Sequence, residues 1–274
     1  MGATQVYDAA RNNSWTTHLA RVGLAAKGFV YVMIGILAIQ LARGERGEAT
    51  AARGALQSIA DEPFGTFLLA AIGIGLFGYA FWRIVQGISD TEHDGSGAKG
   101  IAKRIGRAAS GVLHGSLGLF ALNLALGNGG GSGGGDSTQS WTAKVLSMPL
   151  GEWWVFLIGL GVIGFGVFQI VRGWKEKFRK HLAESEMSQK QRHFAIEAGK
   201  LGFISRGFVF GIIGALLAKA GLSSNPGEAR GLDGALNVLA QREFGTALLA
   251  IVAVGLAAYG LYLFVEARYR RVRM

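Results

Sequence analysis

Six long stretches of mostly apolar residues limit the fold of this chain more than any other feature. They cover residues 22–42, 64–86, 105–126, 151–173, 201–221 and 244–265. A helix that crosses a lipid bilayer needs about 20 mostly apolar residues. Half of the 274 residues are hydrophobic, 44 are glycine and only 17% are charged. The sequence therefore predicts an all-α membrane protein, a six-helix transmembrane bundle.

The first and fifth stretches each contain a positive charge about one turn from their start. These charges are Lys27 and Arg206. A long cationic side chain near a helix end can extend along the helix until its charge reaches the lipid headgroups. We therefore expect both side chains to snorkel toward the interface, and we keep both stretches as membrane spans.

The distribution of Lys and Arg predicts the orientation of the spans. With six spans, 21 of the 28 basic residues fall on the side of the two termini and seven on the opposite side. Basic residues concentrate on the cytoplasmic side of membrane proteins, so both termini are expected there. The net charge of +10 then predicts contact with anionic lipid headgroups on that side, and no nucleic-acid partner.

The sequence also repeats a two-helix unit three times. Each unit has a first apolar helix, a short amphipathic stretch expected to form a helix at the outer interface, and a second apolar helix. The second helices open with Pro63-Phe64-Gly65, Pro149-Leu150-Gly151 and Glu243-Phe244-Gly245. The predicted organisation is a cytoplasmic segment (1–18), repeats at 19–90, 101–174 and 200–270, and a basic cytoplasmic connector (175–199), expected to be an amphipathic helix.

These repeats resemble an uncharacterised bacterial membrane-protein family, common in actinobacteria, that is built from three tandem two-helix repeats. The resemblance covers residues 19–270 and rests on the shared helix openings and the spacing of small residues. It implies the three-repeat fold and the bacterial plasma (inner) membrane, with no assigned activity.

Glycine recurs inside the predicted helices. Two runs, 73–78 and 159–164, match the dinucleotide-binding pattern GxGxxG. That pattern binds a pyrophosphate only at a strand-to-helix turn, whereas here it lies within apolar helices. In membranes, small residues allow helices to approach closely. We expect helix packing at Gly73, Gly75, Gly78, Gly111, Gly115, Gly159, Gly161, Gly164, Gly207, Gly211 and Gly255. A separate run of glycine with a few polar residues, 127–135, predicts a flexible outer linker.

Two groups of polar residues are candidates for a central path or gate. His114 is an ionisable residue well inside a span, and it either serves function or only holds helices together as a neutral side chain. At the inner ends of the second helices, an ion pair between Arg172 and Glu266 would close a central cavity, unless these charges only anchor the helix ends. The candidates are His114, Gln86, Arg172, Glu266, Arg83 and Gln169.

The sequence shows no catalytic arrangement within the spans, and it contains no cysteine. We expect no enzyme activity, no metal and no cofactor. The leading hypothesis is a structural membrane protein that contacts lipids or a possible membrane-protein partner. The alternative is a channel or transporter for a small solute with a pseudo-threefold central path.

Overall fold

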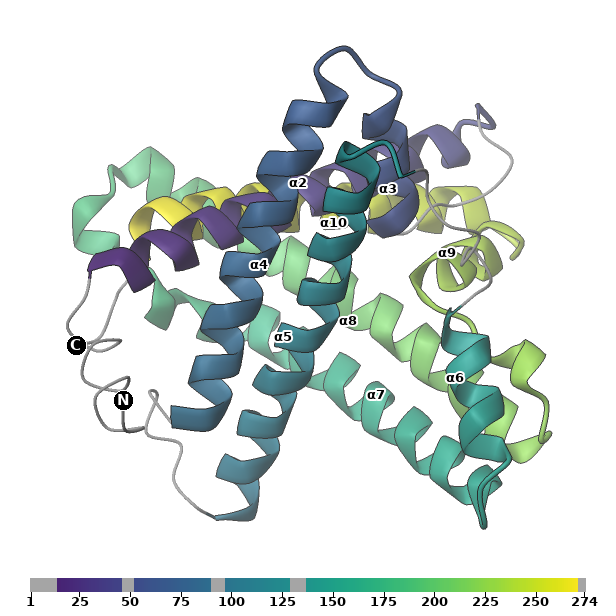
Figure 1. Ribbon diagram of the computed structural model, residues 1–274. Coiled ribbons are helices and arrows are strands. Elements are labelled where there is room, and N and C mark those ends of the chain that lie inside the picture. Colours follow the sequence, from purple (N-terminus) through teal and green to yellow (C-terminus); the bar gives the residue numbers. More distant parts are fainter. Residues whose placement is uncertain (1–13, 46–51, 90–96, 129–136, 271–274) are drawn as a thin grey trace.

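The computed structural model describes residues 14–45, 52–89, 97–128 and 137–270, and within them the regular structure is helical (Figure 1). Each of the six long helices contains a stretch long and apolar enough to cross a membrane. The prediction of a six-helix, multi-pass membrane protein is therefore confirmed. The long helices are α2 (Ser14–Ala42), α4 (Gly65–Ser89), α5 (Ala98–Ala125), α7 (Gly151–Trp174), α8 (Gln189–Leu222) and α10 (Gly245–Tyr269).

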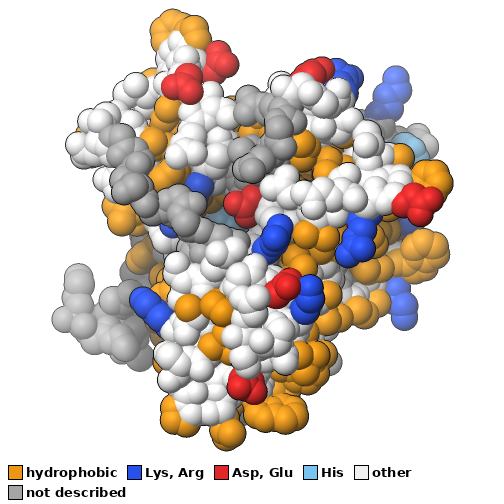
Figure 2. All heavy atoms as spheres, turned by 90° about the vertical axis from the view of Figure 1, so that its right-hand side faces the viewer, with side chains coloured by type: hydrophobic (Ala, Val, Ile, Leu, Met, Phe, Trp, Pro, Cys, Tyr) orange, Lys and Arg blue, Asp and Glu red, His pale blue; other side chains and the backbone are white. Residues whose placement is uncertain are grey.

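A short helix precedes the second long helix of every repeat. These helices are α3 (Ala52–Ala60), α6 (Ser137–Leu146) and α9 (Leu232–Ala240). Leu56 of α3 and Leu236 of α9 are fully buried, so both helices insert their apolar faces into the core. The face that carries α6 and α9 presents acidic and basic side chains among hydrophobic ones (Figure 2). The predicted glycine-rich linker falls largely on residues 129–136, outside the described residues.

The same turn leads from each short helix into the long helix that follows. Phe64, Leu150 and Phe244 all have a positive φ, between 57° and 64°, which is uncommon for residues other than glycine. The next residue is always glycine, and a Cβ atom there would clash with a carbonyl oxygen of the short helix. The repeated sequence pattern therefore encodes a repeated backbone turn.

The six long helices associate in three pairs, each formed by two different repeats. Helix α4 packs along α5, α7 along α8, and the terminal helices α2 and α10 along each other (Figure 1). Equivalent small residues meet at each pair, which brings the backbones close together. These contacts join Gly28 with Gly260, Gly111 with Ala80, and Gly207 with Gly166.

Within a repeat the two long helices pack in the first and third repeats, but not in the second. Helix α2 packs on α4 and α8 packs on α10, whereas no comparable contact joins α5 and α7 among the described residues. The packing expected at Gly161 and Gly164 is therefore not seen, because a Cβ at either position would meet nothing within 4 Å. A Cβ at Gly211 would likewise meet nothing within 4 Å. The backbone of Gly211 is nevertheless close to α7, because a Cβ at Gly166 would lie 2.9 Å from the Gly211 nitrogen.

The remaining predicted glycines do lie at helix contacts. Gly73 faces Leu122 of α5, and Gly159 faces Ala218 of α8. In the same way, packing neighbours surround Gly75, Gly78, Gly111, Gly115, Gly207 and Gly255. Both GxGxxG runs lie inside helices, and all three glycines of the first run but only Gly159 of the second lie at helix contacts.

The single helix expected for the connector between the second and third repeats is wrong in its first half. That half forms two 3-10 turns, η1 (Lys177–His181) and η2 (Glu184–Glu186). Arg179 donates hydrogen bonds of 2.8 Å to Glu184 and Glu176, and these bonds raise its pKa above the ordinary value. Helix α8 starts afterwards, where Ser188 and Gln191 cap its N-terminus reciprocally.

Candidate functional site: a buried cationic centre

Two cations lie buried inside the helix bundle. Lys27 of α2 is 6% exposed and Arg206 of α8 is 8% exposed. Lys27 is within three residues of the middle of its span, His18–Ala42. The prediction that both side chains snorkel to the headgroups is therefore wrong. Each side chain points to aromatic residues of neighbouring helices.

Lys27 is held by a tyrosine of α4. Its Nζ donates a hydrogen bond of 3.1 Å to the hydroxyl of Tyr79 and lies 4.7 Å from the centre of that ring. An ammonium group has three N–H donors. The bond to Tyr79 therefore leaves N–H groups of Lys27 that can donate further hydrogen bonds inside the bundle.

Arg206 is surrounded by aromatic rings. Its Cζ lies 4.2 Å from the ring centre of Tyr259 of α10, 5.2 Å from that of Tyr31 of α2 and 5.6 Å from that of Phe210. Tyr31 and Tyr259 contact each other edge to face, with 4.8 Å between ring centres. The Nε of Arg206 is buried without a hydrogen-bond partner among the described residues.

We call Lys27, Arg206, Tyr31, Tyr79 and Tyr259 the cationic centre. In the part of the chain that the structure describes, neither cation forms an ion pair with a carboxylate. The two cations are close enough to repel each other. Within the described residues, no carboxylate therefore neutralises the positive charge of the centre.

His114 of α5 lies beside this centre. Its ring is 4.7 Å from that of Tyr79, and its Nδ1 is 2.7 Å from the carbonyl oxygen of Ser110. A carbonyl only accepts, so Nδ1 carries the proton of this bond. His114 thus faces a neighbouring helix, α4. It contributes to the wall of the centre.

The residues of the predicted inner layer lie at the ends of α4, α7 and α10, but the expected ion pair is absent. Glu266 pairs with Arg270, which directly follows α10, at 2.6 Å. Arg172 instead lies over the ring of Phe203 of α8, at 4.5 Å. Arg270 is only four residues from the buried Glu266 in the sequence, so it pairs with Glu266 in place of Arg172.

The other members of that layer are buried polar groups. Gln86 and Gln169 are 4% and 2% exposed. Arg83 donates a hydrogen bond of 3.1 Å to Gln86, and its Cζ lies 5.6 Å from the ring centre of Tyr79. Arg83 therefore connects the inner layer to the cationic centre along one face of α4. The gating role of these residues stays a prediction.

The sequence contained a signal that would have found the cationic centre. Lys27 and Arg206 occupy the same position of the first and third repeats, and Tyr79 and Tyr259 share a position on the second helices. Side chains at equivalent positions that face the interior of a cyclic arrangement converge on its axis. The second repeat has Ser110 and Phe165 at these positions, so its contribution carries no charge.

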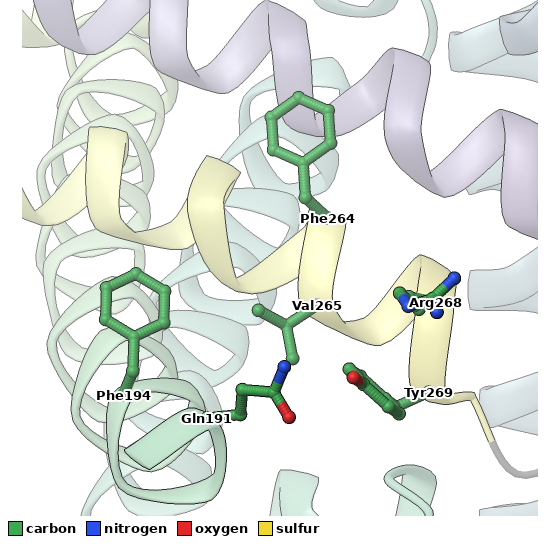
Figure 3. A pocket seen from close by; sticks show the side chains of 6 residues that line it. All are labelled: Gln191, Phe194, Phe264, Val265, Arg268 and Tyr269. Carbon is green, nitrogen blue, oxygen red and sulfur yellow. The ribbon is translucent and has the colours of Figure 1, made fainter. Parts of the chain in front are cut away.

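A separate hollow of about 250 Å³ lies between the start of α8 and the end of α10 (Figure 3). Gln191 and Phe194 line it from α8, and Phe264, Val265, Arg268 and Tyr269 line it from α10. None of these residues belongs to the cationic centre.

Comparison with known proteins identifies the repeats. Each one matches the model of the Domain of Unknown Function (DUF1206), at residues 22–90, 105–176 and 201–270. The chain is also 37% identical over 258 residues to "Uncharacterized protein YxxB" of Bacillus subtilis (strain 168), a match that covers 94% of this chain and 92% of the relative. No solved structure matches the chain significantly. The comparisons confirm a tandem-repeat family, though not its expected association with actinobacteria, and the chain belongs to the DUF1206 family.

Proposed function

We propose that this membrane protein binds an anion at the cationic centre and moves it through the membrane, as a transporter rather than an enzyme. The observation that carries the proposal is the pair of buried cations, Lys27 and Arg206, without a carboxylate partner in the described residues. Charged residues inside a membrane bundle are costly and commonly mark a ligand path.

The energies favour a bound anion. A Lys or Arg at the middle of a membrane-spanning helix costs about 2.5–3.5 kcal/mol on insertion scales. Each aromatic face offsets roughly 0.5–2 kcal/mol of this cost. Arg206 has three such faces, but Lys27 has one ring and one hydrogen bond. An anion between the two cations would remove their mutual repulsion and use the free donors.

The orientation with both termini in the cytoplasm belongs to the same proposal, with the bacterial plasma membrane as the location. The basic residues near the helix ends on that side would contact anionic lipid headgroups. This arrangement places the inner layer, with Arg83 and Arg172, between the cytoplasm and the cationic centre.

A second candidate is the structural role that the sequence favoured, in which lipids or a membrane-protein partner cover the bundle. The specific observation in its favour is that α5 and α7 do not pack on each other. Their apolar side chains, including Leu113 at 67% and Leu157 at 52% exposed, remain available for such contacts.

Thermal unfolding of the purified protein in a neutral detergent separates these candidates. The probes are sodium chloride, sodium phosphate, sodium acetate and phosphatidylglycerol, each compared at matched ionic strength. A ligand that binds only the folded protein raises its melting temperature. We expect at least one anion to do so for the wild type and not for Lys27→Gln or Arg206→Gln.

Arg268→Gln is the matched control, because Arg268 is exposed and outside the cationic centre. This variant should keep the response of the wild type. If no anion stabilises the wild type, or if both centre variants respond as it does, the proposal is wrong and the structural role is favoured. The anion that binds is then tested for uptake into vesicles that contain the protein.

A further inference from the structure

The gap between α5 and α7 lies where the first repeat has the α2–α4 contact and the third repeat has the α8–α10 contact. In the first repeat Gly23 faces Tyr79, and in the third repeat Gly202 faces Tyr259, with hypothetical Cβ atoms within 2.6 Å of the tyrosines. The equivalent Gly106 of α5 meets nothing within 4 Å. Its counterpart Phe165 of α7 is 44% exposed. The second repeat therefore has residues at the same packing positions as the first and third repeats, but its two long helices do not contact each other there.

We call this opening the α5–α7 seam. Its walls are the exposed small and apolar residues that face it by repeat position. They are Ala102, Ile105, Gly106 and Ala109 of α5, and Gly161, Gly164, Phe165 and Phe168 of α7. A hydrated inorganic ion is strongly disfavoured between such walls, whereas a hydrocarbon chain is not.

Aromatic contacts link the seam to the cationic centre. The ring of Phe165 contacts that of Phe210 edge to face, with 5.0 Å between centres. The ring centre of Phe210 lies 5.6 Å from Arg206 Cζ. One aromatic side chain thus separates the seam from a buried guanidinium whose Nε has no partner among the described residues. The seam opens on the repeat that contributes Ser110 where the others contribute a cation.

From this arrangement we infer that the ligand of the cationic centre is an anionic amphiphile, with its phosphate or carboxylate head at Lys27 and Arg206 and its hydrocarbon chain in the α5–α7 seam. The inference rests on the proposed function and adds the class of ligand. Charge complementarity selects the head. The apolar seam beside the centre selects the tail, because a soluble anion would gain nothing from it.

The experiment compares a lipid anion with its soluble head. The melting temperature of the wild type is measured in detergent with increasing dioleoylphosphatidylglycerol, dioleoylphosphatidylcholine or glycerol phosphate. We expect a saturable rise with phosphatidylglycerol alone. Lys27→Gln and Arg206→Gln should each weaken binding about tenfold or more, the effect of one lost charge-assisted hydrogen bond.

Two further variants test the seam. Gly161→Phe places a ring where a Cβ meets nothing, so the protein should fold while binding of phosphatidylglycerol is lost. Val167→Phe is the matched control, because Val167 is exposed on α7 and the first repeat has Phe81 at that position. Native mass spectrometry, which counts bound lipids, gives a second measurement independent of folding stability.

The outcomes separate the two proposals. If glycerol phosphate stabilises the wild type as well as phosphatidylglycerol does, and the centre variants lose this effect, the anion site stands and the amphiphile is excluded. If Gly161→Phe binds phosphatidylglycerol as tightly as Val167→Phe does, the seam is not the binding place of the tail. If neither probe depends on Lys27 or Arg206, the proposed function fails as well.

Discussion

At the scale of single residues, Arg206 combines a functional requirement with a cost in stability. Its guanidinium is buried under three aromatic rings, and its Nε lacks a partner in the described residues. A residue kept for folding alone would be better replaced by an apolar side chain of similar length, because isolated buried charges destabilise a protein. Methionine also makes favourable contacts with aromatic rings.

We therefore expect Arg206→Met to raise the free energy of unfolding by about 1 kcal/mol or more when no anion is present. The same variant should lose the stabilisation by phosphatidylglycerol. Thermal unfolding in detergent measures both effects. Arg268→Met, at an exposed arginine, should change stability by at most about 0.5 kcal/mol. A clear loss of stability in Arg206→Met would show that the arginine holds the fold.

At the scale of helices, the repeated turn before each second long helix explains a sequence pattern that composition does not. The residue before the glycine has a positive φ in all three repeats, although it is Phe or Leu. The glycine then packs directly on a carbonyl oxygen of the short helix. Backbone geometry at the turn, rather than a catalytic or binding role, thus accounts for the glycine in this pattern.

Gly65→Ala tests this interpretation. Its added methyl group would clash with the carbonyl oxygen of Ile59, so we expect a loss of about 1–3 kcal/mol, as for other overpacked positions. Gly211→Ala is the control, because its Cβ meets nothing within 4 Å. It should be neutral or gain roughly 0.5–1 kcal/mol from helix propensity. Equal melting temperatures of the two variants would contradict the interpretation.

The sequence predicted the elements better than their contacts. Apolar length located all six spans, and the spacing of Gly65, Gly151 and Gly245 located the repeats. It did not show that Lys27 points inward, because a charge one turn inside a span can reach either lipid headgroups or a neighbouring helix. It also did not predict that Gly161 stays unpacked, since the same motif packs at Gly75.

At the scale of the whole molecule, the three repeats are equivalent in sequence but not in packing. All three contacts between repeats are formed, whereas one of the three contacts within repeats is open. This asymmetry is the basis of the seam, so it requires a test of its own. The absence of native cysteines allows disulfides to be placed freely.

The pair Leu19→Cys and Gly78→Cys should form a disulfide, because a Cβ on Gly78 lies 3.7 Å from that of Leu19, inside the roughly 3.5–4.5 Å that a disulfide requires. The equivalent pair in the second repeat, Ala102→Cys and Gly164→Cys, should not, since a Cβ on Gly164 meets nothing within 4 Å. Gel mobility after mild oxidation distinguishes them. Equal cross-linking of both pairs would mean that the seam closes.

The proposed orientation is tested with two exposed positions on opposite sides of the bundle. Lys190 lies at the start of α8 and Gln241 directly after α9. In intact cells, a membrane-impermeant thiol reagent should label Gln241→Cys and leave Lys190→Cys unmodified until the cells are opened. The reverse pattern would place the termini outside.

The packing of α2 on α10 makes the first and last long helices neighbours (Figure 1). Each repeat therefore contacts the next, and the third contacts the first, so the three repeats form a closed ring. The neighbours of each repeat are then the same wherever in the ring the chain begins. A circular permutant, joined from α10 to α2 and opened between α4 and α5, would give every long helix the same partners.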